Sequence, residues 1–155
     1  GIQALDLLAR KVLGSKGKLL EAFAAEVIPF CQQNSADENM KEFIEPMLKS
    51  LEQWQRLTQT IGEKAMTNPD EIGAASVDYL MFSGYVTLAY FWARMAKTAQ
   101  LKLAQDTDDA KFYQAKIKTA QFYFQRMLPR SKGHVACILN GADSLMALDS
   151  EDFIF

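Results

Sequence analysis

The chain has 155 residues, of which 49% are apolar and 23% are charged, and its net charge is -2. This length suits one domain, and this balance excludes a chain that is disordered throughout. The 17 basic and 19 acidic residues are spread along the sequence, so no segment has the basic excess that nucleic-acid binding requires. Four prolines and eight glycines are too few for the many turns of a β-sandwich.

The first part of the chain predicts two helices. Apolar residues recur at helical spacing in residues 2–13, and the pattern resumes at Lys18 after a break at residues 14–17. Pro29 lies inside the second pattern. It is expected to kink this helix or to end it near Ile28, because proline lacks the N–H that an interior helical position needs.

Residues 35–66 carry the clearest amphipathic pattern and predict a long helix on the surface of a bundle. Ser35 followed by Glu38 matches a capping box, so the helix is expected to start there. Trp54 lies on the apolar stripe and is expected in the core. Pro46 is expected to bend the helix.

A fourth helix is predicted over residues 68–104, with Asn68 as its cap and Pro69 at its first position. Residues 79–93 contain no charge, but fifteen residues are too few to span a bilayer. We therefore expect no membrane span, and a helix buried on nearly all sides. Gly84 in its middle is expected to allow a neighbouring helix to approach closely.

The remaining sequence predicts helices over residues 107–129, closed by Pro129, and over residues 132–147. Phe153, Ile154 and Phe155 suggest that the acidic tail docks onto the fold. The whole pattern predicts an all-α protein, one antiparallel bundle of about five or six helices that forms a single domain over residues 1–155.

Few side chains could carry chemistry. Zinc sites and di-iron bundles need several Cys, His or Glu ligands at close spacing, and the chain has one histidine, His134, and two cysteines, Cys31 and Cys137. A catalytic triad would depend on His134, beside which the sequence shows no nucleophile. We predict no catalytic and no metal-binding residue. His134 is expected at the surface or as a helix cap, and both cysteines are expected to be buried. Two isolated cysteines also favour a reducing cytosol.

Two further features have alternative interpretations. Asp78 and Arg94 flank the uncharged stretch and lie roughly 24 Å apart along one helix, so each is expected to meet a neighbouring helix or solvent. The aromatic residues could line an apolar ligand pocket, although a packed core is the stronger interpretation. They are Tyr79, Phe82, Tyr85, Tyr90, Phe91, Trp92, Phe122, Tyr123 and Phe124.

The sequence strings resemble a known family. GIQALDLLARKVL, residues 1–13, resembles the segment after the Tyr-Glu-Gly-Thr motif near the end of the acyl-CoA dehydrogenase catalytic domain. Some bacterial members carry an extra C-terminal helical domain, which the strings at residues 77–97, 111–129 and 141–153 resemble in the same order. The resemblance therefore covers nearly the whole chain, with residues 1–13 at the end of the catalytic domain and residues 18–155 in the accessory domain.

This resemblance implies a parent flavoenzyme that dehydrogenates an acyl-CoA thioester, with FAD as cofactor. The catalytic Glu would stand before Gly1, so no catalytic or cofactor-binding residue is carried over, and no FAD is expected in this chain. The chain alone is expected to be inactive. The implied partners are the parent's catalytic domain, its acyl-CoA substrate and a second copy in a homo-oligomer.

Two other functions remain open from the sequence. A stand-alone helical interaction module would present an exposed apolar patch to a partner helix. A small binder of lipids or acyl chains would need a cavity within the aromatic core.

Overall fold

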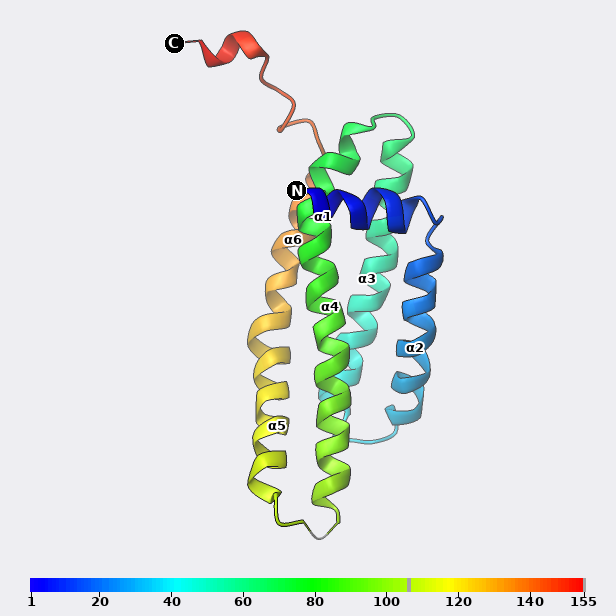
Figure 1. The fold of residues 1–155 in the computed structure, drawn as a ribbon, viewed down its shortest axis with the longest axis vertical. Coiled ribbons are helices and arrows are strands. Elements are labelled where there is room, and N and C mark those ends of the chain that lie inside the picture. The colour runs from blue at the N-terminus through cyan, green and yellow to red at the C-terminus, as the bar shows by residue number, and fades with distance from the viewer. Residues whose placement is uncertain (106, 155) are drawn as a thin grey trace.

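The computed structural model describes residues 1–105 and 107–154, and these residues form helices and turns without any strand. Five helices form a bundle, in which the last two lie end to end (Figure 1). They are α2 (Lys18–Asn34), α3 (Lys41–Ala65), α4 (Asp70–Leu103), α5 (Ala110–Phe122) and α6 (Ser131–Asn140). The prediction of an all-α helical bundle is therefore confirmed.

The first helical segment crosses one end of this bundle. It starts as α1 (Ile2–Leu5) and continues as a wider π-helical stretch, η1 (Asp6–Leu13). Arg10 and Lys11 pair with Asp6 on its outer side and hold the pKa of that carboxyl at about 2. The inner side buries apolar side chains against α4, so this segment is packed into the same core as the five long helices.

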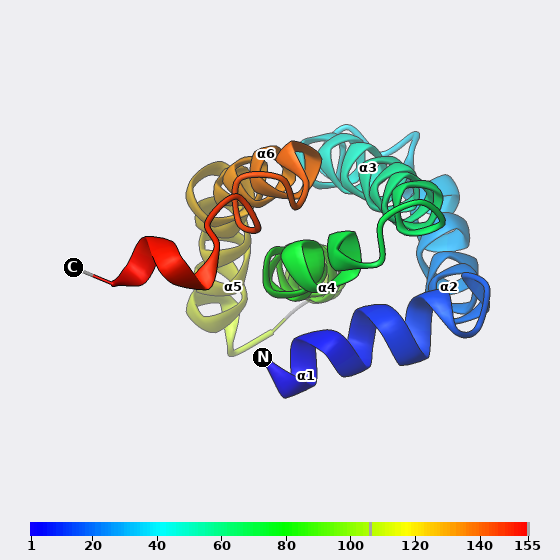
Figure 2. The ribbon, with the colours of Figure 1, turned by 90° about the horizontal axis from the view of Figure 1, so that it is seen from above.

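The longest helix, α4, occupies the middle of the molecule. Seen end on, it is surrounded by an arc of α2, α3, α6 and α5, while α1 passes across its N-terminal end (Figure 2). α5 and α6 are nearly collinear, because a π-helical turn, η2 (Tyr123–Met127), and a 3-10 turn, η3 (Leu128–Arg130), join them. The helix predicted to close at Pro129 does not end there: α5 ends at Phe122, and the helical path runs through Pro129 in η3 directly into α6.

Of the two outcomes expected at Pro29, a kink or an end near Ile28, the end is wrong, because α2 runs through Pro29 to Asn34. Because Pro29 has no N–H, the helix lacks one backbone hydrogen bond there. Two interactions hold the turn that follows. Cys31 is fully buried in the core, and the Asn34 side chain donates a hydrogen bond to the Phe30 carbonyl at 2.8 Å. Burial of this last turn offsets the lost bond.

α3 begins at Lys41, so the predicted start and capping box at Ser35 are wrong. The Ser35 hydroxyl instead donates to the Gln32 carbonyl at the end of α2. Asp37 shapes the connection that follows: its carboxylate accepts the Asn39 N–H at 3.0 Å and pairs with Lys97 of α4 at 2.8 Å. That tertiary pair holds residues 35–40 as turns rather than helix.

The prediction that Trp54 lies in the core is confirmed, because it is buried among the apolar residues on the inner side of α3. α4 begins at Asp70, one residue later than predicted, with Pro69 at its N-cap, and the Asn68 side chain accepts the Asp70 N–H at 3.1 Å.

The end of the chain differs from the sequence prediction. α6 stops at Asn140 rather than near residue 147, because Gly141 takes a positive φ of 76°. The tail does not dock: it leads away from the bundle to a short 3-10 helix, η4 (Ser150–Phe153), and both Phe153 and Ile154 are exposed (Figure 1). The third tail residue of that prediction, Phe155, lies outside the described residues.

Candidate functional site

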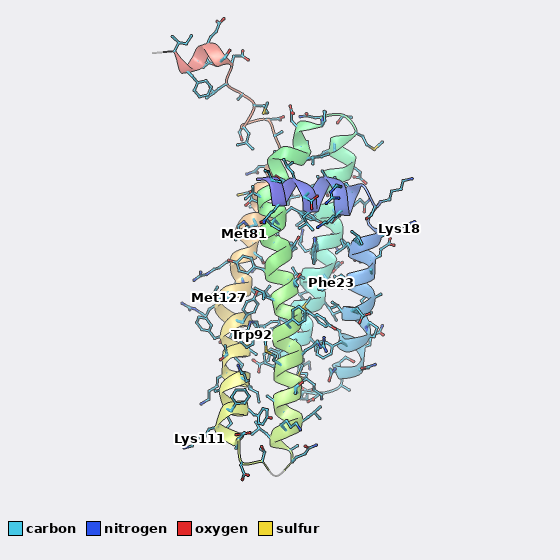
Figure 3. All side chains as sticks on the ribbon, in the orientation of Figure 1. Lys18, Phe23, Met81, Trp92, Lys111 and Met127 are labelled. Atoms are coloured by element: carbon cyan, nitrogen blue, oxygen red, sulfur yellow. The ribbon has the colours of Figure 1, made fainter. Side chains whose placement is uncertain are left out.

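The aromatic residues at the centre of the bundle pack against one another. Phe23 reaches from α2 towards α3 and α4, with its ring centroid 5.6 Å from Trp54 and 5.8 Å from Tyr90 (Figure 3). Tyr79 is fully buried, and its hydroxyl shares a 2.6 Å hydrogen bond with Thr58. Burial raises the pKa of Tyr79. Interlocked rings of this kind form a packed core.

Not every residue of the predicted aromatic set is part of this core. Tyr123 is buried, and its hydroxyl donates to the Tyr85 carbonyl at 2.8 Å, while burial raises the pKa of Tyr123 to about 12. Phe91 and Phe122 instead point to the surface. The residues of that set therefore divide between the core and the outside of the bundle.

His134 has a partner that the sequence did not reveal. Its Nδ1 lies 2.7 Å from a carboxylate oxygen of Asp78, and its ring lies 5.8 Å from that of Tyr85. The expectation that Asp78 meets a neighbouring helix is thus confirmed, with His134 of α6 as the partner. The pair is partly buried and links α4 to α6.

The other chemically distinctive residues lie apart. Arg94 sits over the ring of Tyr90, with 5.5 Å between the guanidinium carbon and the ring centroid. Cys31 is buried as predicted, but Cys137 is exposed, so that prediction is wrong. Among the described residues, no three His, Cys, Asp or Glu side chains come close enough together to hold a metal ion. Within the same residues, no helix has the length and apolar character that crossing a membrane requires.

The prediction that α4 is buried on nearly all sides is wrong, because one face of the helix is uncovered. Val77, Met81, Gly84 and Leu88 recur at intervals of four and three residues along that face, and all are exposed. We call these four residues the α4 stripe. No neighbouring helix approaches Gly84, since a Cβ built there would meet nothing within 4 Å.

The start of the chain lies at one end of the α4 stripe. Gly1 and Ile2 line a shallow depression together with Val77 and Leu80, and the Ile2 side chain is almost fully exposed. Residues from α1 and α4 therefore form one continuous apolar surface at this end of the bundle.

Beyond the α4 stripe, towards the loop between α4 and α5, the surface is hollowed into an open groove of about 460 Å³. Its apolar lining comes from Phe91 and Met95 of α4 and from Phe112 and Tyr113 of α5. Two cations, Arg94 and Lys116, stand beside these apolar side chains. A second groove, lined in part by Phe82 and Phe124, lies between α3 and the α5–α6 rod.

The fold is an all-α helical bundle, and comparison with known proteins defines its family. Residues 23–149 match the family described as acetyl-CoA dehydrogenase C-terminal like, and the chain belongs to that family.

Two curated relatives extend this result. The chain is 30% identical over 151 residues to a 3-methylmercaptopropionyl-CoA dehydrogenase of Ruegeria pomeroyi, covering 94% of this chain and 25% of the relative. It is 24% identical over 160 residues to the broad-specificity linear acyl-CoA dehydrogenase FadE5 of Mycobacterium tuberculosis, covering 98% of this chain and 26% of that protein. The chain thus spans about a quarter of the length of these relatives.

The N-terminal ends of α2, α3 and α4 do not fit the pyrophosphate of the FAD that this family implies. A dinucleotide places its pyrophosphate where backbone N–H groups point at it, most often at the start of a helix. Three of the long helices carry a carboxylate in their first turn instead: Glu21 in α2, Glu42 in α3 and Asp70 in α4. These acids would repel a pyrophosphate, so no step of flavin chemistry is assigned to these residues.

Proposed function

We propose that this chain is the accessory C-terminal domain of a flavin-dependent acyl-CoA dehydrogenase and that it packs on the catalytic domain of its parent or on a sister subunit. Family membership supports this proposal, as does the match to only a quarter of each acyl-CoA dehydrogenase relative. Residues 18–155 form the accessory domain, and residues 1–13 lead into it from the catalytic domain. We place the parent in the cytoplasm.

In this proposal the parent removes two hydrogens from the acyl chain of a CoA thioester, with FAD as the acceptor. The base that takes the α-proton precedes Gly1, as the resemblance of residues 1–13 implies. The isolated chain then has no activity and binds no FAD. Its contribution is to hold the chain that follows the base, or to wall the acyl end of the parent's pocket.

The α4 stripe is the observation that carries the proposal. Exposing the uncharged α4 stripe to water is energetically unfavourable unless another surface covers it. Gly84 costs about 1 kcal/mol relative to alanine within a helix, and no described residue fills the space where its Cβ would lie. Since Gly1 lies beside Val77, a catalytic domain joined at Gly1 is held at high local concentration next to this surface.

The test is a pair of matched substitutions in the longer protein. Leu88 on the α4 stripe and Leu19 on α2 are 51% and 52% exposed. Leu88→Glu should separate the domain from its partner, because it buries an unpaired charge in the contact. We expect a distinct low-temperature transition for this domain in calorimetry and faster proteolytic release. Leu19→Glu should leave both readouts unchanged.

Equal behaviour of the two variants would contradict docking through the α4 stripe. The wider assignment has a separate test: a Tyr-Glu-Gly-Thr motif or a close variant should be encoded just upstream of Gly1, and the pure 155-residue chain should lack flavin absorbance. If the reading frame instead begins at this chain, the same α4 stripe favours the second candidate, a stand-alone helical interaction module.

A further inference from the structure

The groove between α4 and α5 combines an apolar lining with positive charge. Phe91 and Phe112 are both about half exposed there, although each is large enough to favour burial. The Lys116 ammonium lies 5.1 Å from the centroid of the Phe112 ring, and Arg94 lines the same hollow. Among the described residues neither cation takes part in an ion pair. Such a site fits a ligand that is both apolar and anionic.

Residues 149–154 of the chain, DSEDFI, have the complementary character. Three carboxylates precede Phe153 and Ile154, which are 64% and 80% exposed. The segment is already shaped, because Asp149 and Asp152 form a reciprocal capping box around η4 and the Asp149 N–H donates to Asp152 at 2.8 Å. It therefore presents two apolar side chains next to carboxylates, and it loses little conformational entropy on binding because it is already ordered.

We infer that residues 149–154 of one copy of the chain dock into the α4–α5 groove of a second copy. Phe153 and Ile154 lie against Phe91, Met95 and Phe112, and the carboxylates face Arg94 and Lys116. A reciprocal exchange between two antiparallel bundles satisfies both grooves with one two-fold axis. This inference concerns the 155-residue chain alone and does not depend on the proposed function.

The geometry of one bundle excludes its own segment as the occupant. The Ala142 N–H is held by Glu71 at 3.3 Å, and the Met146 N–H closes a turn onto the Ala142 carbonyl at 3.0 Å. Met146 thus stays near Ile72 at the start of α4. From Ile72 to Phe91, the nearest residue of the groove on α4, the helix rises roughly 28 Å. Fully extended chain from Met146 to Phe153 spans at most roughly 24 Å, and less while η4 is formed, so the segment falls short of its own groove.

Self-association of the 155-residue chain, measured by sedimentation equilibrium, tests the inference. We expect a dimer that weakens with added salt, because charged groups contribute to it. Replacing the apolar pair, Phe153→Ser with Ile154→Ser, should weaken the dimer at least about tenfold. Reversing the groove charges, Arg94→Glu with Lys116→Glu, should do the same. Circular dichroism should show that these substitutions, none of them at a fully buried position, leave the helices intact.

A matched control separates the groove from net charge. Lys118→Glu with Arg126→Glu changes one lysine and one arginine at exposed positions of the same rod, outside the groove. This variant should dimerise as the unchanged chain does. If it weakens the dimer as much as the groove variant, or if the groove variant has no effect, the inference is overturned.

A direct binding measurement completes the test. A fluorescein-labelled peptide of residues 147–154, ALDSEDFI, should bind the Phe153→Ser, Ile154→Ser chain by anisotropy, and at least about tenfold more weakly when the groove charges are reversed as well. A chain that stays monomeric yet blocks the peptide would show docking within one molecule and overturn the inference. Binding of octanoate at the groove without binding of the peptide would overturn it too, in favour of a small anionic amphiphile.

Discussion

The two cysteines of the chain occupy opposite environments. Cys31 is fully buried on α2, and burial raises the pKa of its thiol to about 11. Cys137 lies exposed on α6. Because the thiolate is the reactive form, a thiol with a pKa near 11 is almost entirely protonated at pH 8 and is also out of reach of reagents.

We therefore expect one thiol of the native chain to react with iodoacetamide at pH 8, and two after unfolding in guanidinium chloride. Mass spectrometry of the labelled chain gives the count. The variant Cys137→Ser should show no fast labelling in the native state and one label after unfolding. Native labelling of Cys31 at the rate of an exposed thiol would contradict the burial of the α2 face on which it lies.

At the residue scale, the sequence could predict that a residue makes a contact, but it could not identify the partner residue. The charge of Asp78, at the edge of an uncharged stretch, was enough to predict a contact with a neighbouring helix or solvent. It could not identify His134, because the two residues are 56 positions apart and meet only after α4 and α6 pack side by side. Cys137 was wrongly predicted to be buried for a related reason. Which face of the short helix α6 is buried depends on how α6 packs against the other helices, and the local sequence does not show this.

At the scale of elements, the end of α6 is fixed by residues from two other helices. The Lys64 ammonium donates to the Leu139 carbonyl at 3.2 Å, and Glu71 accepts the Ala142 N–H at 3.3 Å. These bonds satisfy backbone groups that a helix end leaves unpaired. Gly141 between them has a φ of 76°, and a Cβ there would lie 2.8 Å from Glu71 Oε1.

Gly141→Ala should consequently lower the free energy of unfolding by about 1–3 kcal/mol, because it adds both backbone strain and a clash. Gly133→Ala is the matched control, since it lies in the same helix and a Cβ there meets nothing within 4 Å. That change should stabilise the chain by up to about 1 kcal/mol. Urea unfolding followed by circular dichroism measures both, and equal effects would show that the Glu71 contact does not constrain Gly141.

The helix boundaries show where local patterns were sufficient. The Asn68-Pro69 signal placed the start of α4 to within one residue, because the hydrogen bond of Asn68 to the Asp70 N–H is made within the same few residues. The boundaries of α3 and α6 were misplaced, because Lys97 and Glu71 reach them from elsewhere in the chain. The periodicity past Gly141 was also misleading: Ala142 is buried, but in a turn against Glu71 and not in a helix.

At the scale of the whole molecule, the two ends of the chain have different relations to the bundle. Residues 2–13 bury Ala4, Leu8 and Val12 against the long helices. Residues 149–154 are exposed throughout. The sequence predicted helix for the first segment and docking for the second. It could not show that the first closes the core and the second leaves it, since both carry apolar residues beside charges.

This difference predicts unequal costs for the same substitution at the two ends. Leu8 is 0% exposed and Leu148 is 61% exposed. Leu8→Ala should lower the free energy of unfolding of the 155-residue chain by about 2–5 kcal/mol, because it leaves a cavity in the core. Leu148→Ala should change it by less than about 0.5 kcal/mol. Urea unfolding at fixed protein concentration measures both. If residues 1–13 served the catalytic domain alone, Leu8→Ala would cost no more than Leu148→Ala, so the comparison also tests whether the bundle needs its first helix.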